Sequence, residues 1–164
     1  MIPRILKNFQ GFIDGVGYAG LVDEVELPEV AIKTEEHRAG GMDGNYEVDM
    51  GMETMSAKIT MAEPRPELLG ALMTNKRVQL RGSFVRDTDG SRVSVVVAMG
   101  ARQKKLTLGS WKAGDKNQNE QEYTLDYFRL VVGGVEILEI DIVNMVRRVR
   151  GVDQLAGIRA DIGM

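Results

Sequence analysis

Two runs of alternating residues meet at a pair of glycines, and this arrangement constrains the fold more than any other part of the sequence. The runs are Glu122–Val132 and Val135–Val143, and Gly133-Gly134 joins them. Glycine adopts positive φ angles without steric cost, so a two-glycine link suits the tight turn of a β-hairpin. The sequence therefore predicts two antiparallel strands here.

Strand patterns also occupy much of the remaining chain. Six further segments show alternation or a short apolar run, and Asp89-Gly90 predicts a second hairpin turn. Pro28 would place its segment at a sheet edge, because proline cannot donate to a ladder. The six segments are Phe9–Ile13, Glu24–Lys33, Ser56–Met61, Val78–Phe84, Arg92–Met99 and Lys104–Ser110.

One helix is predicted within this largely β chain. Pro66 suits a first helical position, and four apolar residues follow at helical spacing. A weaker helical pattern covers Asp153–Ile162. We therefore expect a mainly β fold, a β-sandwich or small barrel with one packed α-helix. The apolar stripe of the first helix comprises Leu68, Leu69, Leu72 and Met73.

The segment Thr34–Thr54 matches neither pattern. It holds four glycines, several carboxylates and no clean periodicity, which predicts a long loop of the kind that is usually functional or mobile. Its methionines have two interpretations, because methionine fills irregular contacts. Met42, Met50 and Met52 either pack in the core or are buried by a neighbouring subunit.

Composition bounds the class of protein. A length of 164 residues with 43% apolar residues indicates a single domain over residues 1–164. The absence of cysteine excludes disulfides and thiolate zinc sites, and it is typical of a reducing compartment. No apolar run approaches the roughly 20 residues of a membrane span, and the N-terminus has no signal-peptide core, so we expect no membrane association.

Charge is unevenly distributed along the chain. Residues 1–63 hold 12 acidic and 5 basic side chains, whereas residues 64–164 hold 12 acidic and 16 basic ones. This asymmetry is either chance or the mark of two surfaces of opposite sign. Head-to-tail assembly of identical subunits needs two different, complementary surfaces of this kind.

No motif predicts catalysis or a cofactor. Gly15–Gly20 fits G-x-G-x-x-G, but acidic residues and Pro28 follow where a phosphate-binding helix should begin. Asp87–Gly90 resembles the start of a calcium loop, yet Ala98 stands where a glutamate is required. His37 is the only histidine. We therefore expect no enzyme, no cofactor and no metal site.

A short basic run, Arg147–Arg150, raises the question of nucleic-acid binding. Such binding usually adds stacking aromatic residues or a wider basic stripe, and aromatic residues make up only 5% of the chain. A small β-barrel nucleic-acid-binding module is therefore the weaker functional alternative. The run is expected to be an exposed face or the basic side of a contact between subunits.

Short blocks in a fixed order give a family resemblance over almost the whole chain. In their order and spacing they resemble the major tail tube protein of contractile-tailed bacteriophages, and the tube proteins of tailocins such as R-type pyocins. The resemblance implies a structural protein whose hexameric rings stack into the inner tube of a tail. The blocks are Ile5–Phe9, Phe12–Gly20, Gly40–Gly44, Asp49–Glu53, Glu139–Asn144 and Gly151–Asp153.

The same resemblance implies partners and a location. The partners are further copies of the chain, a tail sheath, a baseplate hub, a tape-measure protein and a tail terminator. The lumen would pass DNA without specific binding, and the protein would belong to the virion after assembly in the host bacterial cytoplasm. A secretion-system tube protein of the haemolysin-coregulated type is the alternative with a similar implied fold.

Two sets of site residues follow. Successive strand residues face opposite sides, so Glu139 and Asp141 should lie opposite the apolar residues of their strand, and we predict that they face the lumen. Glu136 should share the apolar side. The loop 34–54 is predicted to be an assembly element that stays mobile in a free subunit. Its inter-ring contact residues are Met42, Asp43, Met50 and Met52.

Overall fold

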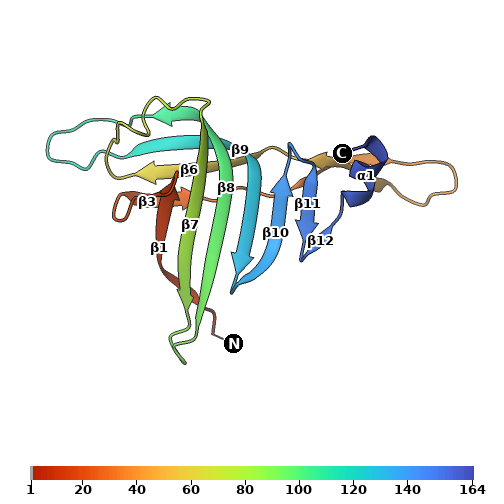
Figure 1. The fold of residues 1–164 in the computed structure, drawn as a ribbon, viewed down its shortest axis with the longest axis horizontal. Coiled ribbons are helices and arrows are strands. Elements are labelled where there is room, and N and C mark those ends of the chain that lie inside the picture. Colours follow the sequence, from red (N-terminus) through yellow and green to blue (C-terminus); the bar gives the residue numbers. More distant parts are fainter. Residues whose placement is uncertain (1) are drawn as a thin grey trace.

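The computed structural model describes residues 2–164, which form a mainly β protein with one short helix (Figure 1). The described part contains no helix that is long and apolar enough to cross a membrane. The elements are β1 Ile5–Ile13, β2 Val16–Gly17, β3 Val22–Glu26, β4 Ile32–His37, β5 Tyr46–Met52, β6 Met55–Met61, β7 Asn75–Val85, β8 Arg92–Thr107, β9 Asn119–Val132, β10 Val135–Asp141, β11 Val146–Val149, β12 Val152–Asp153 and α1 Ala156–Ile162.

One strand, β9, organises the main sheet. Its first half, Asn119–Leu125, pairs with β6, and its second half, Tyr127–Val132, pairs with β10 along the same edge. Its other edge pairs with β8 along nearly its whole length. The sheet therefore runs β12-β11-β10-β9-β8-β7-β1-β2, with β6 and then β3 branching from β9.

The branch folds over the sheet and encloses the core. Strand β6 alternates strictly between buried and half-buried residues, as expected of a strand whose one face lies in the interior. Ile59 and Met61 on this strand are almost fully buried against the wall formed by β7, β8 and β9. Strands β1 and β3 do not pair with each other, so the half-barrel keeps an open seam between them.

The hairpin at Gly133-Gly134 is confirmed. Val132 pairs with Val135, and the two glycines have φ angles of +59° and +82°. Positive φ at both positions is the geometry that two-residue hairpins favour, and glycine adopts it without strain. The turn before Ser91 also forms, with Gly90 at φ +66°. The predicted strands 92–99 and 104–110 merge into the single long strand β8, which ends at Thr107, so residues 108–110 lie outside it.

The predicted helix over residues 66–73 is wrong. The amides of Leu68 and Leu69 both donate to the carbonyl of Arg65, at 3.0 Å each, and the turn ends at Gly70 with φ +79°. Leu68 is buried in the core, so tertiary packing fixes this segment as a single turn. The helix that does form is α1, within the weaker pattern at 153–162, and it ends at Gly163 with φ +78°.

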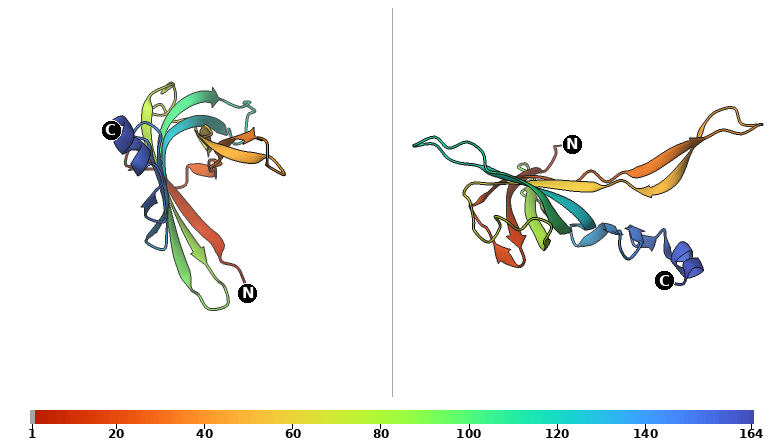
Figure 2. Two further views of the ribbon diagram at one scale, coloured as in Figure 1. Left: turned by 90° about the vertical axis from the view of Figure 1, so that its right-hand side faces the viewer. Right: turned by 90° about the horizontal axis from the view of Figure 1, so that it is seen from above.

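The prediction of an irregular loop over 34–54 is also wrong, because most of this segment forms two paired strands. Strands β4 and β5 pair in an antiparallel ribbon that projects from the body as a long arm (Figures 1 and 2). We call residues 32–52 the arm. Strand β5 carries an alternation that predicts a strand, because Tyr46, Val48 and Met50 alternate with acidic side chains. The glycines nearby obscure that pattern.

Truncating a buried aliphatic side chain of the core should destabilise the subunit strongly. Ile59 is 1% exposed, so Ile59→Ala should lower the free energy of unfolding by about 2–5 kcal/mol, through lost burial and the cavity it leaves. Ile162 is 58% exposed, and Ile162→Ala should change it by less than about 0.5 kcal/mol. Urea unfolding of dilute protein measures both, and equal losses would contradict this assignment of the core.

Candidate assembly surfaces

The arm is a ribbon with two chemically different faces. Val48 pairs with Glu35 and Tyr46 with His37 on one face, whereas Glu47 pairs with Glu36 on the other. Tyr46 is 63% exposed and Val48 is 38% exposed, so the described residues leave much of their apolar surface uncovered. An isolated two-stranded hairpin is only marginally stable in water. The arm therefore presents an apolar surface that needs a partner.

The base of the arm is fixed by an ion pair. Arg147 of β11 donates from both terminal nitrogens to the carboxylate of Asp49, and it lies 4.0 Å from the sulfur of Met52. The arginine is only 9% exposed. Its hydrogen bond, together with the amide of Gly51, lowers the pKa of the Asp49 carboxyl. The pair joins segments 98 positions apart, and no pattern in the sequence points to it.

The four predicted inter-ring residues occupy two separate places on the arm. Met42 and Asp43 lie at the tip, where the sulfur of Met42 accepts a hydrogen bond from the Ala39 amide at 3.3 Å. Met50 and Met52 lie at the other end of β5. Met50 is half exposed, but Met52 packs against the core, so its role is at least partly internal. Sequence reasoning missed Tyr46 and Val48 as contact candidates.

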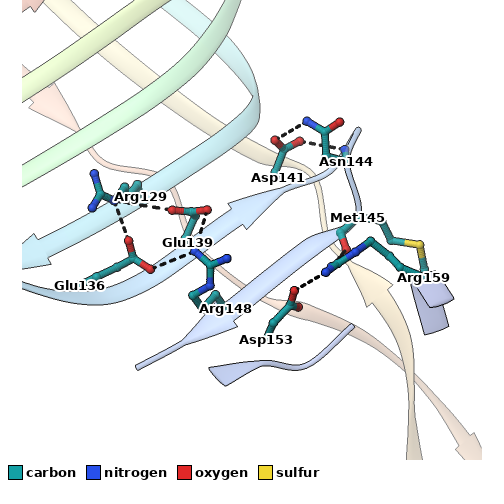
Figure 3. Close-up of polar contacts among 9 residues, drawn as sticks. All are labelled: Arg129, Glu136, Glu139, Asp141, Asn144, Met145, Arg148, Asp153 and Arg159. Atoms are coloured by element: carbon teal, nitrogen blue, oxygen red, sulfur yellow. Dashed lines mark hydrogen bonds and ion pairs between the residues drawn. The ribbon is translucent and has the colours of Figure 1, made fainter. Parts of the chain in front are cut away.

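Glu139 lies on the face of the sheet turned away from the core, which we call the polar face. It is opposite Arg129 of β9 and Arg148 of β11 in the ladder. Arg148 lies 3.3 Å from one Glu139 oxygen, and Arg129 lies 3.6 Å from the other (Figure 3). The carboxylate is therefore charge-paired within its own subunit.

Glu136 joins the same cluster, and its predicted position on the apolar side is wrong. The nitrogen Nε of Arg129 donates to Glu136 at 2.8 Å, and Arg148 lies 3.6 Å from its other oxygen (Figure 3). A register shift between Glu136 and Leu138 explains the error, because a bulge reverses the parity of the residues before it. The two arginines and two glutamates thus form one four-residue ionic cluster, and Arg129 lowers the pKa of Glu136.

Asp141 holds the turn that follows β10. Its two oxygens accept hydrogen bonds from the amide and the side chain of Asn144, at 3.0 and 2.7 Å (Figure 3). In the ladder it stands opposite Tyr127, so it shares the polar face with Glu139. It also borders a broad open hollow on this face, of about 1100 Å³, that reaches Asp14 and Arg77 at the other side.

The basic run does not form one surface. Arg147 points to the core side and binds the arm, whereas Arg148 points to the polar face and binds the glutamates. The prediction of a shared exposed face is therefore wrong for these two residues, because neighbouring residues of a strand point in opposite directions. Of the three arginines in the run, Arg150, in the turn before β12, is the exposed one.

The two ends of the sheet remain unpaired within the described residues. At one end β12 pairs only with β11, and at the other the short β2 covers only two residues of β1. Exposed apolar side chains gather at both ends, among them Val152 at the first and Val16 at the second. Residues 2–164 contain no group of three or more acidic or histidine side chains placed to hold a metal ion.

Comparison with known proteins identifies what this architecture belongs to. The sequence model of the family described as phage tail tube protein FII matches residues 3–163. The chain belongs to this family. The tail tube protein of Escherichia phage P2 is 34% identical over 170 residues, covering 99% of each chain. The major tail tube protein of Serratia phage KSP20 is 28% identical over 148 residues, covering 88% of this chain and 86% of the relative.

Solved structures agree at the level of the fold. The chain is similar to a protein in the PVC sheath-tube complex of an extracellular contractile injection system in the extended state, with a TM-score of 0.58 and 14% identity over 79% of this chain and 90% of that one. It is also similar to a protein in the tube-terminating cap of the anti-feeding prophage, with a TM-score of 0.60 and 12% identity over 80% and 91%. The mainly β prediction is confirmed.

Family membership settles the class of function. A tail tube protein of this family is a structural component of the inner tube of a contractile tail, and it is not an enzyme. The expected resemblance is confirmed, and the nucleic-acid-binding module is set aside. The exposed edges, the arm and the polar face are therefore candidate assembly surfaces of a tail tube component.

The Asp49–Arg147 pair should be visible as an acid titration. Because the folded pKa of Asp49 is lowered, the pair stabilises the arm base above the ordinary carboxyl pKa, and this stabilisation is lost as the pH falls through the folded value. Carbon NMR of the Asp49 carboxyl should give a midpoint below 3.8, and Arg147→Met should raise it. Arg129→Met is the matched control and should leave Asp49 unchanged. A midpoint that does not respond to Arg147→Met contradicts the pairing.

Proposed function

We propose that copies of this chain join side by side into hexameric rings and that these rings stack to form the inner tube. The unpaired sheet edges at opposite ends of the subunit carry this proposal. Exposed strand edges invite pairing, and closure into a ring removes them. The two ends differ from each other, so the contact is head-to-tail, and the opposite net charges of residues 1–63 and 64–164 support it.

Six subunits per ring is the part of the proposal that rests most on relatives. A protein in the baseplate of the anti-feeding prophage, solved with sixfold symmetry, has a similar fold, with a TM-score of 0.52 and 12% identity over 75% of this chain. If the terminal strands of neighbouring subunits pair edge to edge, the sheets of all subunits join into one continuous barrel wall. The polar face then surrounds the lumen, and the core side lies outward.

The arm provides the contact between rings in this proposal. Its apolar face, formed by Tyr46, Val48 and Met50, is exposed in the single chain. Asp43 is exposed in the turn at the tip of the arm. Burial of this face by the next ring would offset the entropy of ordering the arm. Met42 supports the tip, and Met52 fixes the base, so the predicted contact set acts through both ends of the arm.

Glu139 and Asp141 face the lumen in this arrangement, on the wall that DNA would pass. Their carboxylates are not free, because Glu139 is paired with two arginines and Asp141 holds a turn. A wall on which acidic and basic groups neutralise each other avoids a strong attraction to phosphates, so DNA could move without specific binding. We propose this balance in place of a purely acidic lining.

The remaining partners follow from the tail architecture. Outside the tube a sheath would surround the core side, a baseplate hub and a terminator would cap the two ends, and a tape-measure protein would set the length. The similar folds in a sheath-tube complex, a tube-terminating cap and a baseplate support these partners. The protein is a component of a virion tail, and we place its assembly in the cytoplasm of the host bacterium.

Loss of the apolar face of the arm should stop stacking and spare the subunit. In the variant Tyr46→Ser, Val48→Ser and Met50→Ser, purified protein at high concentration should form single rings and no tubes in negative-stain micrographs. The matched control Glu36→Ser with Glu47→Ser changes the opposite face of the same ribbon and should still give tubes. Tubes of normal length from the first variant would show that the arm does not connect rings.

A further inference from the structure

Helix α1 carries an apolar stripe that the described residues of its own chain leave exposed. The helix has seven residues, Ala156–Ile162, and none of them is buried. Ile158 is 49% exposed and Ile162 is 58% exposed, and with Leu155 before the helix they lie on one side at helical spacing. So short a helix is marginal in water without tertiary packing. Its apolar side therefore needs a contact that the single chain does not provide.

A side chain at the edge of this stripe, Arg159, is already engaged. Arg159 donates to Asp153 at 2.6 Å and to the carbonyl of Met145 at 2.8 Å (Figure 3). Both partners belong to the β11–β12 end of the sheet, so these two bonds hold α1 beside the terminal strand. Ile158 and Ile162 remain exposed beside this anchor, at the outermost end of the sheet.

The other end of the molecule has an apolar groove. It lies along the open seam between β1 and β3, has a volume of about 280 Å³, and is bordered by the acidic side chains of Asp23 and Glu24. Within the described residues no strand pairing closes this seam, and the exposed Leu6 lies there beside the half-buried Phe9 and Phe84. Its apolar lining includes Leu6, Phe9, Val25, Leu27, Phe84 and Val95.

We propose that α1 of one copy seats its stripe in the β1–β3 groove of the neighbouring copy within the ring. The proposal rests on the side-by-side assembly proposed above and names a contact that would hold it together. Stripe and groove lie at opposite ends of the same sheet, so a subunit does not fill its own groove (Figure 1). Every copy carries one of each, and the contact repeats around a closed ring.

Two further observations favour a second copy as the occupant. The contact is continuous with the proposed edge pairing, because α1 follows β12 directly and the groove runs along β1. The charges are also complementary, since the exposed Arg150 precedes β12 whereas the exposed Glu24 borders the groove. The second acidic residue there, Asp23, is already paired with Lys116 of its own chain. The apolar face of the arm is the competing occupant, and the experiment below distinguishes the two.

Site-specific cross-linking tests the proposal cleanly, because the chain contains no cysteine. Ile162→Cys places a thiol on the stripe and Leu27→Cys places one at the groove, and both positions are exposed, so the fold should tolerate them. The two single variants are mixed, assembled and treated with a short bis-maleimide. We expect a heterodimer from this mixture, and a ladder of up to six subunits from the chain that carries both substitutions.

Val48→Cys on the arm is the matched control. It replaces Ile162→Cys in the same mixture with Leu27→Cys, and we expect little heterodimer from it. In parallel, Ile158→Ser with Ile162→Ser should raise the protein concentration needed for rings by at least about tenfold, since two aliphatic side chains lose their burial. Circular dichroism and unfolding of the dilute variant should match the original chain.

The outcomes separate this proposal from the broader one. Rings or tubes in micrographs without the Ile162–Leu27 cross-link would overturn the docking of α1 and leave tube assembly standing. A cross-link between Val48 and Leu27 in its place would assign the groove to the arm. Failure to form rings under any condition, with the same monomer cross-linking pattern in every mixture, would overturn both proposals.

Discussion

The divided pairing of β9 is the constraint on which the rest of the structure depends. Its first half belongs to the half-barrel and its second half to the open end of the sheet, and the change occurs at Asp126. This residue is skipped in the pairing with β8, where Gly100 faces Tyr127 directly, and its carbonyl accepts the amide of Ile142 at 2.9 Å. An added Cβ at Gly100 would lie 3.0 Å from the Tyr127 side chain, so glycine allows the bulge to form. Because of this bulge, the first half of β9 can pair with β6 around the core, and its second half can pair with β10 in the open end of the sheet.

The subunit leaves apolar surface exposed in three places that a monomeric protein would normally cover. These are the face of the arm, the stripe of α1 and the seam between β1 and β3. The arm and α1 are short or isolated elements that pack poorly on their own body, whereas the seam is a gap between two strands of the body that do not pair. The single chain is therefore an incomplete unit, and we propose that identical copies bury the remaining apolar surface. The internal ion pairs have a complementary role, because Asp49–Arg147 and Asp153–Arg159 hold the arm and α1 at their bases.

Sequence patterns predicted the parts of the fold that depend on local chemistry. Backbone φ preferences and residue spacing were enough to predict three features. These are the Gly133-Gly134 hairpin, the alternating strands and the C-terminal helix. The loop predicted over 34–54 failed for a local reason, because glycines obscured the alternation of β5. Two other failures have non-local causes. Burial of Leu68 kept the segment at 66–73 as a turn, and a bulge moved Glu136 to the opposite face. The partnership of Asp49 with Arg147 spans two elements that no pattern connects. The family resemblance supplied the function, whereas the contact surfaces, including Tyr46, Val48 and α1, came from exposure in the folded chain.

A cryo-electron microscopy reconstruction of assembled protein tests the central claim most directly, because it shows which surfaces of neighbouring copies meet. The account predicts head-to-tail rings in which the β12 end of each subunit lies beside the β1–β2 end of the next, with Glu139 and Asp141 toward the lumen. It also predicts that the arm, the α1 stripe and the β1–β3 seam are all buried between copies. Twofold dimers that pair the same edge of two subunits, or rings with the polar face outward, would contradict it.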